Sequence, residues 1–241
     1  MQHHKQKTSG GRIKAILTDF NGVIINDEPI QHEAYREIFH EDGIDVTDEM
    51  YYSRLGMDDK TFVASILAEA GKPADMDHVL KLTAEKTARW RSIVSEAMPL
   101  FDGVENFFRK MSQELSLGIV SMAKREEIDF VLETVGIADC FSVVISADDV
   151  TKCKPDPECY RLGFRELDLS RIAQGHSAMI HEDCLVIEDS PPGVAAGRNA
   201  GLPVLGVTNT VPAEQLRAAG AGAIAKNLND WMPDSVRRVF A

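Results

Sequence analysis

Several features that define special classes of protein are missing from this chain of 241 residues. No apolar run approaches the roughly 20 residues of a membrane span, and the polar start MQHHKQKTSGGR lacks the apolar segment of a secretory signal. The four cysteines form neither a CxxC pair nor a zinc-like spacing. We therefore expect a reduced, cytoplasmic protein without a membrane partner. Residues 1–11 are interpreted as a flexible tail in which His3 and His4 have no metal role.

Basic residues are scarce as well. Lys and Arg number 26 against 38 Asp and Glu, which gives a formal net charge of −12. This balance argues against nucleic acid or an anionic membrane surface as the main partner. An anionic substrate would need a local cluster of positive side chains. The length and the 44% hydrophobic content are those of an ordinary globular protein, either one sizeable domain or a core with a smaller insert.

Strand and helix patterns alternate through most of the chain. Short apolar runs bounded by polar or glycine-bearing loops predict five buried strands, at 15–18, 117–121, 142–146, 184–187 and 204–207. Helical spacing of apolar residues lies between them, at 126–135, 158–166 and 193–200. This alternation predicts a Rossmann-like, doubly wound α/β core whose parallel sheet is covered on both faces. Ligands of such sheets bind beyond the carboxyl ends of the strands.

One long segment interrupts the alternation. Residues 30–98 show only helical patterns, such as TFVASILAEA and VLKLTAEKTARWRSIV, without a convincing strand. Pro99 and Gly103 punctuate the return of the chain to strand–helix alternation. We therefore predict a helical cap at 30–98, inserted into a core formed by residues 12–29 and 99–241.

Polar side chains gather where the predicted strands end. They are Asp19, Asn21, Ser121, Lys154, Glu188 and Asp189. Two acidic sites with a hydroxyl and a lysine suit a phosphoryl group bound to Mg²⁺. Carboxylates are ligands of this hard cation, and serine and lysine bind phosphate oxygens. A carboxylate can also attack phosphorus to form an acyl phosphate.

The same groups occur within four short motifs, TDFNG, IVS, CKPDP and IEDSPPG, in that order. Together they resemble the haloacid dehalogenase-like superfamily, in particular its branch with a helical cap, which is similar to β-phosphoglucomutase and phosphoglycolate phosphatase. The likeness runs from about Lys14 to Val207, which is nearly the whole chain. One such motif alone is weak evidence, whereas four in register are specific.

The resemblance implies a catalytic and metal-binding role for the first and last motifs. Asp19 resembles the nucleophile and is also implied as a Mg²⁺ ligand. The backbone carbonyl of Asn21 and the carboxylate of Asp189 are implied as further ligands, and Glu188 as a ligand acting directly or through water. The backbone amides around Gly22 would complete a phosphate cradle.

The two middle motifs are implied to hold the phosphate. Ser121 and Lys154 resemble the phosphate-binding residues of the family, and Lys154 is also implied to restrain Asp19.

Asn21 departs from the family pattern, which has a second acid at this place. That acid protonates the leaving oxygen and then activates the acceptor. An asparagine cannot exchange a proton at neutral pH, and general acid–base catalysis contributes about 10²–10⁴ in rate. Three explanations stay open: an introduced substitution that traps substrate, a slow enzyme that uses another acid or the substrate itself, and a phosphate-ligand sensor. Asp27 and Glu28, in the segment DEP, are the nearby carboxylates.

The cap is expected to supply specificity. A histidine often lies on the entering helix in the resembling enzymes, where this sequence has Gln31, followed by His32 one residue later. His32 is therefore weighed as a substrate contact against a surface position. In SRLGMDDKTF, Gly56 predicts a tight turn, and Arg54 and Lys60 are candidates to bind a sugar or a second phosphate, or are solvated charges.

These observations predict a Mg²⁺-dependent phosphatase that acts on a small phosphorylated metabolite through an aspartyl-phosphate on Asp19, as a monomer or small homo-oligomer. Its activity is expected to be reduced by Asn21. A phosphomutase of the β-phosphoglucomutase type and a catalytically weak phosphate-binding protein are the alternatives. A dehalogenase is disfavoured, because that reaction needs no metal and would leave Glu188 and Asp189 without a purpose.

Overall fold

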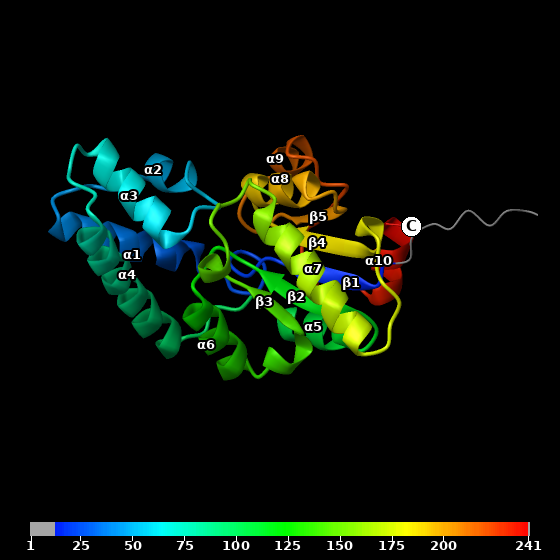
Figure 1. Cartoon of the computed structure of the whole chain (residues 1–241). Coiled ribbons are helices and arrows are strands. Elements are labelled where there is room, and N and C mark those ends of the chain that lie inside the picture. Colours follow the sequence, from blue (N-terminus) through cyan, green and yellow to red (C-terminus); the bar gives the residue numbers. More distant parts are fainter. Residues whose placement is uncertain (1–12, 241) are drawn as a thin grey trace, which may run out of the picture.

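The computed structural model describes residues 13–240, so the tail predicted at 1–11 lies outside the described residues. Within them, six strands form one parallel sheet in the order β3-β2-β1-β4-β5-β6 (Figure 1). Ala15 of the central strand β1 pairs with Ser116 of β2 on one side and with Cys184 of β4 on the other. The strand order reverses here, which is where ligands bind in open α/β sheets. The strands are β1 (Ala15–Thr18), β2 (Ser116–Val120), β3 (Val143–Ile145), β4 (Cys184–Glu188), β5 (Val204–Val207) and β6 (Ala223–Ala225).

Helices cover both faces of this sheet, as the apolar strands predict. Successive strand residues point to opposite faces, so Ala15 and Leu17 pack into one core cluster and Ile16 into the other. The first face is covered by α7 (Glu158–Ala173), α8 (Pro191–Asn199) and α9 (Ala213–Ala218), and the second by α5 (Val104–Ser112), α6 (Arg125–Val135) and α10 (Pro233–Val239). The predicted Rossmann-like, doubly wound α/β fold is confirmed.

Two elements differ from the sequence-based expectation. The sixth strand, β6, was not predicted, because its residues AIA lie in a stretch of alanine and glycine that shows no bulky apolar run. Helix α7 continues to Ala173 instead of ending at residue 166. Its later turns contain buried Leu167 and Arg171, and the Arg171 guanidinium donates to the carbonyl of Lys14.

The segment between β1 and α5 is helical. It contains α1 (Glu28–Glu41), α2 (Asp48–Tyr52), α3 (Asp59–Glu69) and α4 (Met76–Glu96), which lie together at one end of the molecule in Figure 1. Asp58 and Asp75 accept hydrogen bonds from the first turns of α3 and α4, which fixes where these helices begin. The four helices share a core cluster separate from those of the sheet. The domain division at residues 30 and 98 stays a prediction, since helix α1 begins at Glu28.

A buried ion pair joins the helical segment to the sheet. The ammonium of Lys86 in α4 lies 3.0 Å from Asp59 of α3 and 3.4 Å from Glu127 of α6, and Lys86 is 1% exposed. Removing one partner of such a buried group costs about 3–5 kcal/mol. This contact therefore fixes the helical segment against the core. In residues 13–240, no helix has the length and apolar character needed to cross a membrane.

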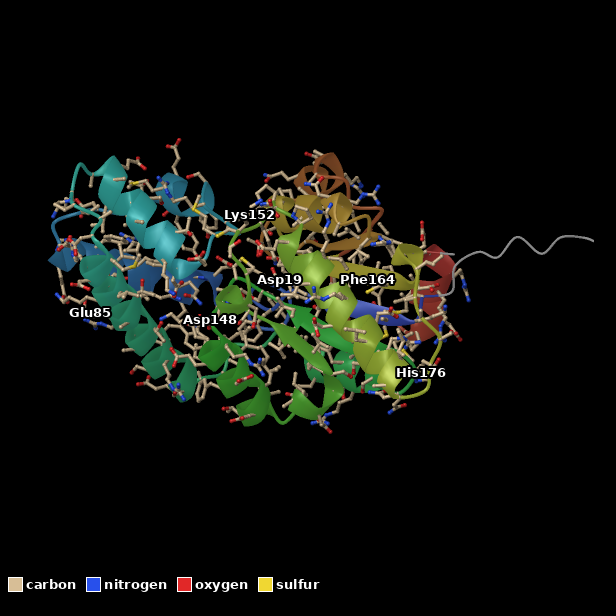
Figure 2. All side chains as sticks on the ribbon, viewed as in Figure 1. Asp19, Glu85, Asp148, Lys152, Phe164 and His176 are labelled. Atoms are coloured by element: carbon tan, nitrogen blue, oxygen red, sulfur yellow. The ribbon has the colours of Figure 1, made fainter. Side chains whose placement is uncertain are left out.

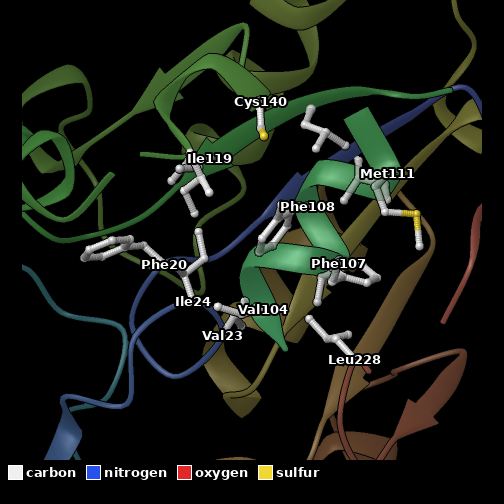
Figure 3. Close-up of a cluster of buried hydrophobic side chains, with 14 of the residues drawn as sticks. Phe20, Val23, Ile24, Val104, Phe107, Phe108, Met111, Ile119, Cys140 and Leu228 are labelled. Atoms are coloured by element: carbon white, nitrogen blue, oxygen red, sulfur yellow. The ribbon is translucent and has the colours of Figure 1, made fainter. Parts of the chain in front are cut away.

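We expect the largest core side chains to carry much of the stability. Phe108 of α5 is fully buried among Phe107, Ile119 and Cys140 (Figure 3), and its ring centroid lies 5.1 Å from that of Phe141. Replacing Phe108 with alanine should lower the free energy of unfolding by about 3–5 kcal/mol in urea titrations. The control, Ile172→Ala at a 44% exposed position of α7, should lower it by about 0.5 kcal/mol or less. Equal losses would contradict this assignment of the core.

Candidate active site

Asp19 stands at the carboxyl end of β1, between the helical segment and the sheet (Figure 2). Its backbone amide still donates to Ile187 of β4, so the carboxylate projects from a rigid strand end. Oδ1 accepts from the amide of Phe20 at 2.7 Å, and Oδ2 lies 2.9 Å from the Lys154 ammonium. The side chain is therefore held in one orientation while the residue remains 8% exposed.

Lys154 connects the ends of three neighbouring strands. Its Nζ lies 2.9 Å from Asp19 after β1 and 2.6 Å from Glu188 at the end of β4, and donates to the Val120 carbonyl of β2 at 3.3 Å. Burial on its own lowers the pKa of Lys154, but the charges of Asp19 and Glu188 outweigh it and raise the pKa above its ordinary value. The ammonium is therefore charged at neutral pH.

Three carboxylates form an acidic cluster beside this lysine. Asp19, Glu188 and Asp189 each place an oxygen within 4.8 Å of the others. Burial, followed by repulsion from Glu188, raises the pKa of Asp19 to about 7. Burial also raises the pKa of Asp189 well above its usual range. A hard divalent cation fits such a set of crowded oxygen donors.

The members of this cluster are not equivalent. Both Glu188 oxygens are occupied: Oε1 by Lys154 and the Tyr160 hydroxyl, and Oε2 by the amides of Asp189 and Ser190 and the Ser190 hydroxyl. By contrast, Asp189 accepts one hydrogen bond, from Thr210 after β5. A cation would therefore find more open coordination at Asp19 and Asp189 than at Glu188.

Gly22 makes room for this cluster. Its φ is +72°, and a Cβ at this position would lie 1.8 Å from Asp189 Oδ2. Its carbonyl accepts from Asn209 at 2.7 Å. The Gly22 amide donates to the Ile25 carbonyl at 2.9 Å, and the phosphate cradle expected from the backbone amides around Gly22 stays a prediction. The Gly22 N–H therefore forms a hydrogen bond within the tight turn after β1.

Asn21 is held by a buried carboxylate. Its Nδ2 lies 2.9 and 3.1 Å from the two oxygens of Asp27, which also accept from Gln31 Nε2 at 2.8 Å and Trp90 Nε1 at 2.7 Å. Burial raises the pKa of Asp27, while these hydrogen bonds lower it. Three side chains thus donate to a fully buried carboxylate. Trp90, a fully buried side chain of α4, is thus a hydrogen-bond donor as well as a core residue.

Ser121 lies on the other side of Asn21. It follows β2 directly, is 1% exposed, and its hydroxyl donates to Asn21 Oδ1 at 3.3 Å. The amide of Ala123 donates to the same hydroxyl at 3.1 Å. The structure thus brings together Asp19, Asn21, Ser121, Lys154, Glu188 and Asp189, the six residues that end the predicted strands or follow them.

A cavity of about 90 Å³ lies over these residues and under the helical segment. Gly56, at φ +86°, forms part of its wall, where a Cβ would lie 3.2 Å from Lys154 Cβ and 3.0 Å from Pro192 Cγ. Arg54 lines the cavity, but its guanidinium donates to the Met50 carbonyl and the Ser65 hydroxyl and pairs with Glu69. The expected tight turn at Gly56 is thus present, and Arg54 is engaged within the helical segment.

Two expected substrate contacts lie outside the cavity wall. His32 is stacked on Tyr51 with ring centroids 4.6 Å apart, because one residue turns a helix by about 100°. Gln31 lines the cavity in its place, and Lys60 is exposed on α3 away from it. Sequence reasoning did not single out Glu127, Lys86, Thr210, Tyr35 and Tyr51. Only the tertiary packing of α1–α4, α6 and the loop after β5 identifies them.

Comparisons with known proteins show the family to which this chain belongs. A sequence model of the haloacid dehalogenase-like hydrolase family matches residues 13–201. The chain therefore belongs to this family, and the predicted enzyme class, a hydrolase of haloacid dehalogenase-like type, is confirmed. It is 30% identical to the validoxylamine A 7'-phosphate phosphatase of Streptomyces hygroscopicus subsp. limoneus, over 90% of this chain and 95% of that protein.

Other relatives agree with this assignment. The phosphorylated carbohydrates phosphatase of Thermotoga maritima is 27% identical, over 89% of this chain and 94% of that protein. Among solved structures, the β-phosphoglucomutase of Clostridium difficile is similar with a TM-score of 0.80 and 23% identity, over 95% of this chain and 97% of that one. That structure supports the fold.

The close approach of Gly22 to Asp189 can be tested by adding a side chain at position 22. Gly22→Ala forces a left-handed alanine, which costs about 1–2 kcal/mol, and its Cβ also collides with Asp189, which adds about 1–3 kcal/mol. Gly71→Ala is the matched control, since Gly71 has φ +68° with no atom within 4 Å of the added Cβ. Urea unfolding in chelator should show the larger loss for Gly22→Ala. If both variants lost the same free energy of unfolding, the contact between position 22 and Asp189 would make no contribution to the loss.

The contact between Asn21 and Asp27 can be tested with a second carboxylate at position 21. Asn21→Asp would place a second carboxylate against Asp27 and raise the pKa of the pair in the folded state above its unfolded value. A raised carboxyl pKa means lost stability above that pKa and recovery as the pair takes up a proton. The free energy of unfolding should therefore fall by about 1–3 kcal/mol at pH 8 and by less at pH 5.

The matched control for this variant is Asn26→Asp, an exposed residue in the same turn. It should change stability by about 0.5 kcal/mol or less at both pH values. A loss for Asn21→Asp that does not depend on pH would argue against repulsion between the two carboxylates.

Proposed function

We propose that this protein is a Mg²⁺-dependent phosphatase that hydrolyses a small phosphorylated metabolite through an aspartyl-phosphate on Asp19. The observation that carries this proposal is the arrangement of Asp19 between the Lys154 ammonium, at 2.9 Å, and the acidic cluster with Glu188 and Asp189. A carboxylate held on a strand end beside groups for a cation and for phosphate suits nucleophilic attack on phosphorus. The phosphatases among the relatives support the same reaction class.

Asp19, Asp189 and the backbone carbonyl of Asn21 would hold Mg²⁺ directly. Glu188 would act through water, because both of its oxygens already accept hydrogen bonds from the protein. The bound ion would neutralise charge on the phosphate oxygens.

The chain's own residues would carry the transfer. The Ser121 hydroxyl and the Lys154 ammonium would bind phosphate oxygens, and Lys154 would also hold Asp19 in its attacking orientation. Attack by the Asp19 carboxylate breaks the ester bond and leaves an acyl phosphate, which water then hydrolyses. The helical segment closes over the site and excludes bulk water during the transfer.

Hydrolysis is favoured over a phosphomutase by the charges around the cavity. A mutase must hold a second phosphate away from Asp19. The cations that the helical segment contributes to the wall are already engaged, Arg54 with Glu69 and Lys86 with Asp59 and Glu127. Within the described residues, this leaves the helical segment without a free cation in the wall for a second phosphate.

The proposal predicts a strict dependence on Asp19 and on magnesium. On a panel of sugar phosphates, glycerol phosphate and p-nitrophenyl phosphate, the wild type should release phosphate with Mg²⁺ and stop in excess chelator. Asp19→Asn should abolish both turnover and covalent labelling by acetyl [³²P]phosphate. Asp77→Asn, at an exposed position of α4, is the matched control and should keep both. Activity that survives in chelator, or labelling that survives in Asp19→Asn, would refute the proposal.

A further inference from the structure

The proposed reaction requires a proton that Asn21 cannot give. An alkoxide leaving from phosphorus needs a general acid, and an amide has no exchangeable proton for this purpose at neutral pH. Five carboxylates line the cavity: Asp19, Glu28, Asp59, Glu127 and Asp189. Their contacts separate the candidate acid from the others.

Four of these carboxylates are engaged. Asp19 and Asp189 belong to the proposed nucleophile and cation site. Asp59 and Glu127 both pair with the ammonium of Lys86, at 3.0 and 3.4 Å. Glu28 is the remaining carboxylate of the cavity wall.

We propose that Glu28 is the general acid and base of this active site, supplying the proton that Asn21 cannot. This inference rests on the proposed phosphatase function. Glu28 is the first residue of α1, half-buried, where the chain passes from the core into the helical segment. Its Oε2 accepts from the Tyr51 hydroxyl at 2.6 Å, while Oε1 has no hydrogen-bond partner within residues 13–240. One oxygen is thus anchored, and the other is available on a side chain that lines the cavity.

Asp27, the neighbouring carboxylate, is unsuited to this role. It is fully buried, it does not line the cavity, and its oxygens accept from Asn21, Gln31 and Trp90. Asp27 instead holds the Asn21 side chain in place, and its charge raises the pKa of Glu28.

The surroundings of Glu28 keep both of its protonation states accessible. Burial and then the charge of Asp27 raise the pKa of Glu28 to about 7, whereas the Tyr51 hydrogen bond and the charge of Lys86 lower it. The other ionisable groups of the cavity wall are Arg54, Asp59, Glu127 and Tyr35 from the helices, and Asp19, Lys154 and Asp189 from the strand ends. A group that titrates near neutrality can both donate and accept a proton in one cycle.

The proposed reaction has two half-reactions, in which Asp19 forms and breaks the bond to phosphorus and Glu28 gives and takes the proton. In the first, the Asp19 carboxylate forms a bond to phosphorus, the ester P–O bond breaks, and protonated Glu28 gives its proton to the leaving oxygen. In the second, water attacks the acyl phosphate while the Glu28 carboxylate takes the water's proton. The bond between phosphorus and Asp19 breaks, phosphate leaves, and Glu28 is again protonated.

The test compares Glu28→Gln with wild type on two kinds of substrate. The alkyl ester that the wild type hydrolyses fastest needs a protonated leaving group, whereas p-nitrophenolate leaves as a stable anion. Glu28→Gln should lower kcat on the alkyl ester by about 10²-fold or more. It should still release a burst of about one equivalent of nitrophenolate per Asp19, because only the second half-reaction then lacks its base. Glu33→Gln, an exposed carboxylate on the same helix, is the matched control and should behave as wild type.

A second variant tests the role without removing the carboxylate. In the wild type, kcat/KM on the alkyl ester should fall as pH rises through about 7, since Glu28 must be protonated in the free enzyme. The Tyr51 hydroxyl lowers the pKa of Glu28, so Tyr51→Phe should shift this fall in kcat/KM to higher pH. In Glu28→Gln, kcat/KM should not show this fall.

The outcomes separate this inference from the function on which it rests. If no ester is hydrolysed with Mg²⁺, the phosphatase proposal fails and this inference fails with it. If the wild type hydrolyses p-nitrophenyl phosphate but no alkyl ester, the phosphatase stands and the site has no general acid. The role of Glu28 would be overturned if Glu28→Gln left kcat unchanged, raised KM alone or abolished the nitrophenolate burst. It would also be overturned if the fall of kcat/KM with pH did not shift in Tyr51→Phe.

Discussion

The structure depends above all on the buried ammonium of Lys154. It connects Asp19 after β1, Glu188 at the end of β4 and the Val120 carbonyl of β2, so that one charge ties together three adjacent strand ends. Two carboxylates this close and this deeply buried would repel each other without a cation between them. Removal of one partner from such a group costs about 3–5 kcal/mol, so the same contact that orients the candidate nucleophile also stabilises the sheet.

The same requirement for a partner explains the surroundings of Asn21. Asp27 is fully buried in the turn after β1, and an acid at position 21 would face it with a second negative charge, whereas the Asn21 amide offers donors within 3.1 Å of both oxygens. Gln31 and Trp90 complete the arrangement from α1 and α4. The amide is therefore part of a buried hydrogen-bonded network around Asp27, which disfavours the view that it is an isolated lesion in a site built for a second acid.

The helical segment contributes more than a cover. Lys86 reaches from α4 to Glu127 of the core, and Asp58 at the start of α3 is within 2.9 Å of the Cys153 thiol, beside Lys154. These contacts bring α1–α4 down onto the strand ends. The cavity of about 90 Å³ is small beside the usual ligand pocket of about 300–1,000 Å³. Glu28, at the junction between the core and the helical segment, lines the same cavity as Asp19.

The sequence by itself determined the parallel α/β core, the helical character of the segment after the first strand, and which polar residues stand at or after the strand ends. Apolar runs of strand length and the motifs beginning at Asp19 and ending at Asp189 carry that information locally, and the family comparison confirms the class. Only the tertiary structure decided that Gln31 replaces His32 in the cavity wall, and that Asp27 is sealed while Glu28 is open to the cavity. The physical reason is that side-chain direction on a helix changes by about 100° per residue. Burial, moreover, depends on segments far along the chain, here α2 and α4, which no local pattern around residue 28 contains.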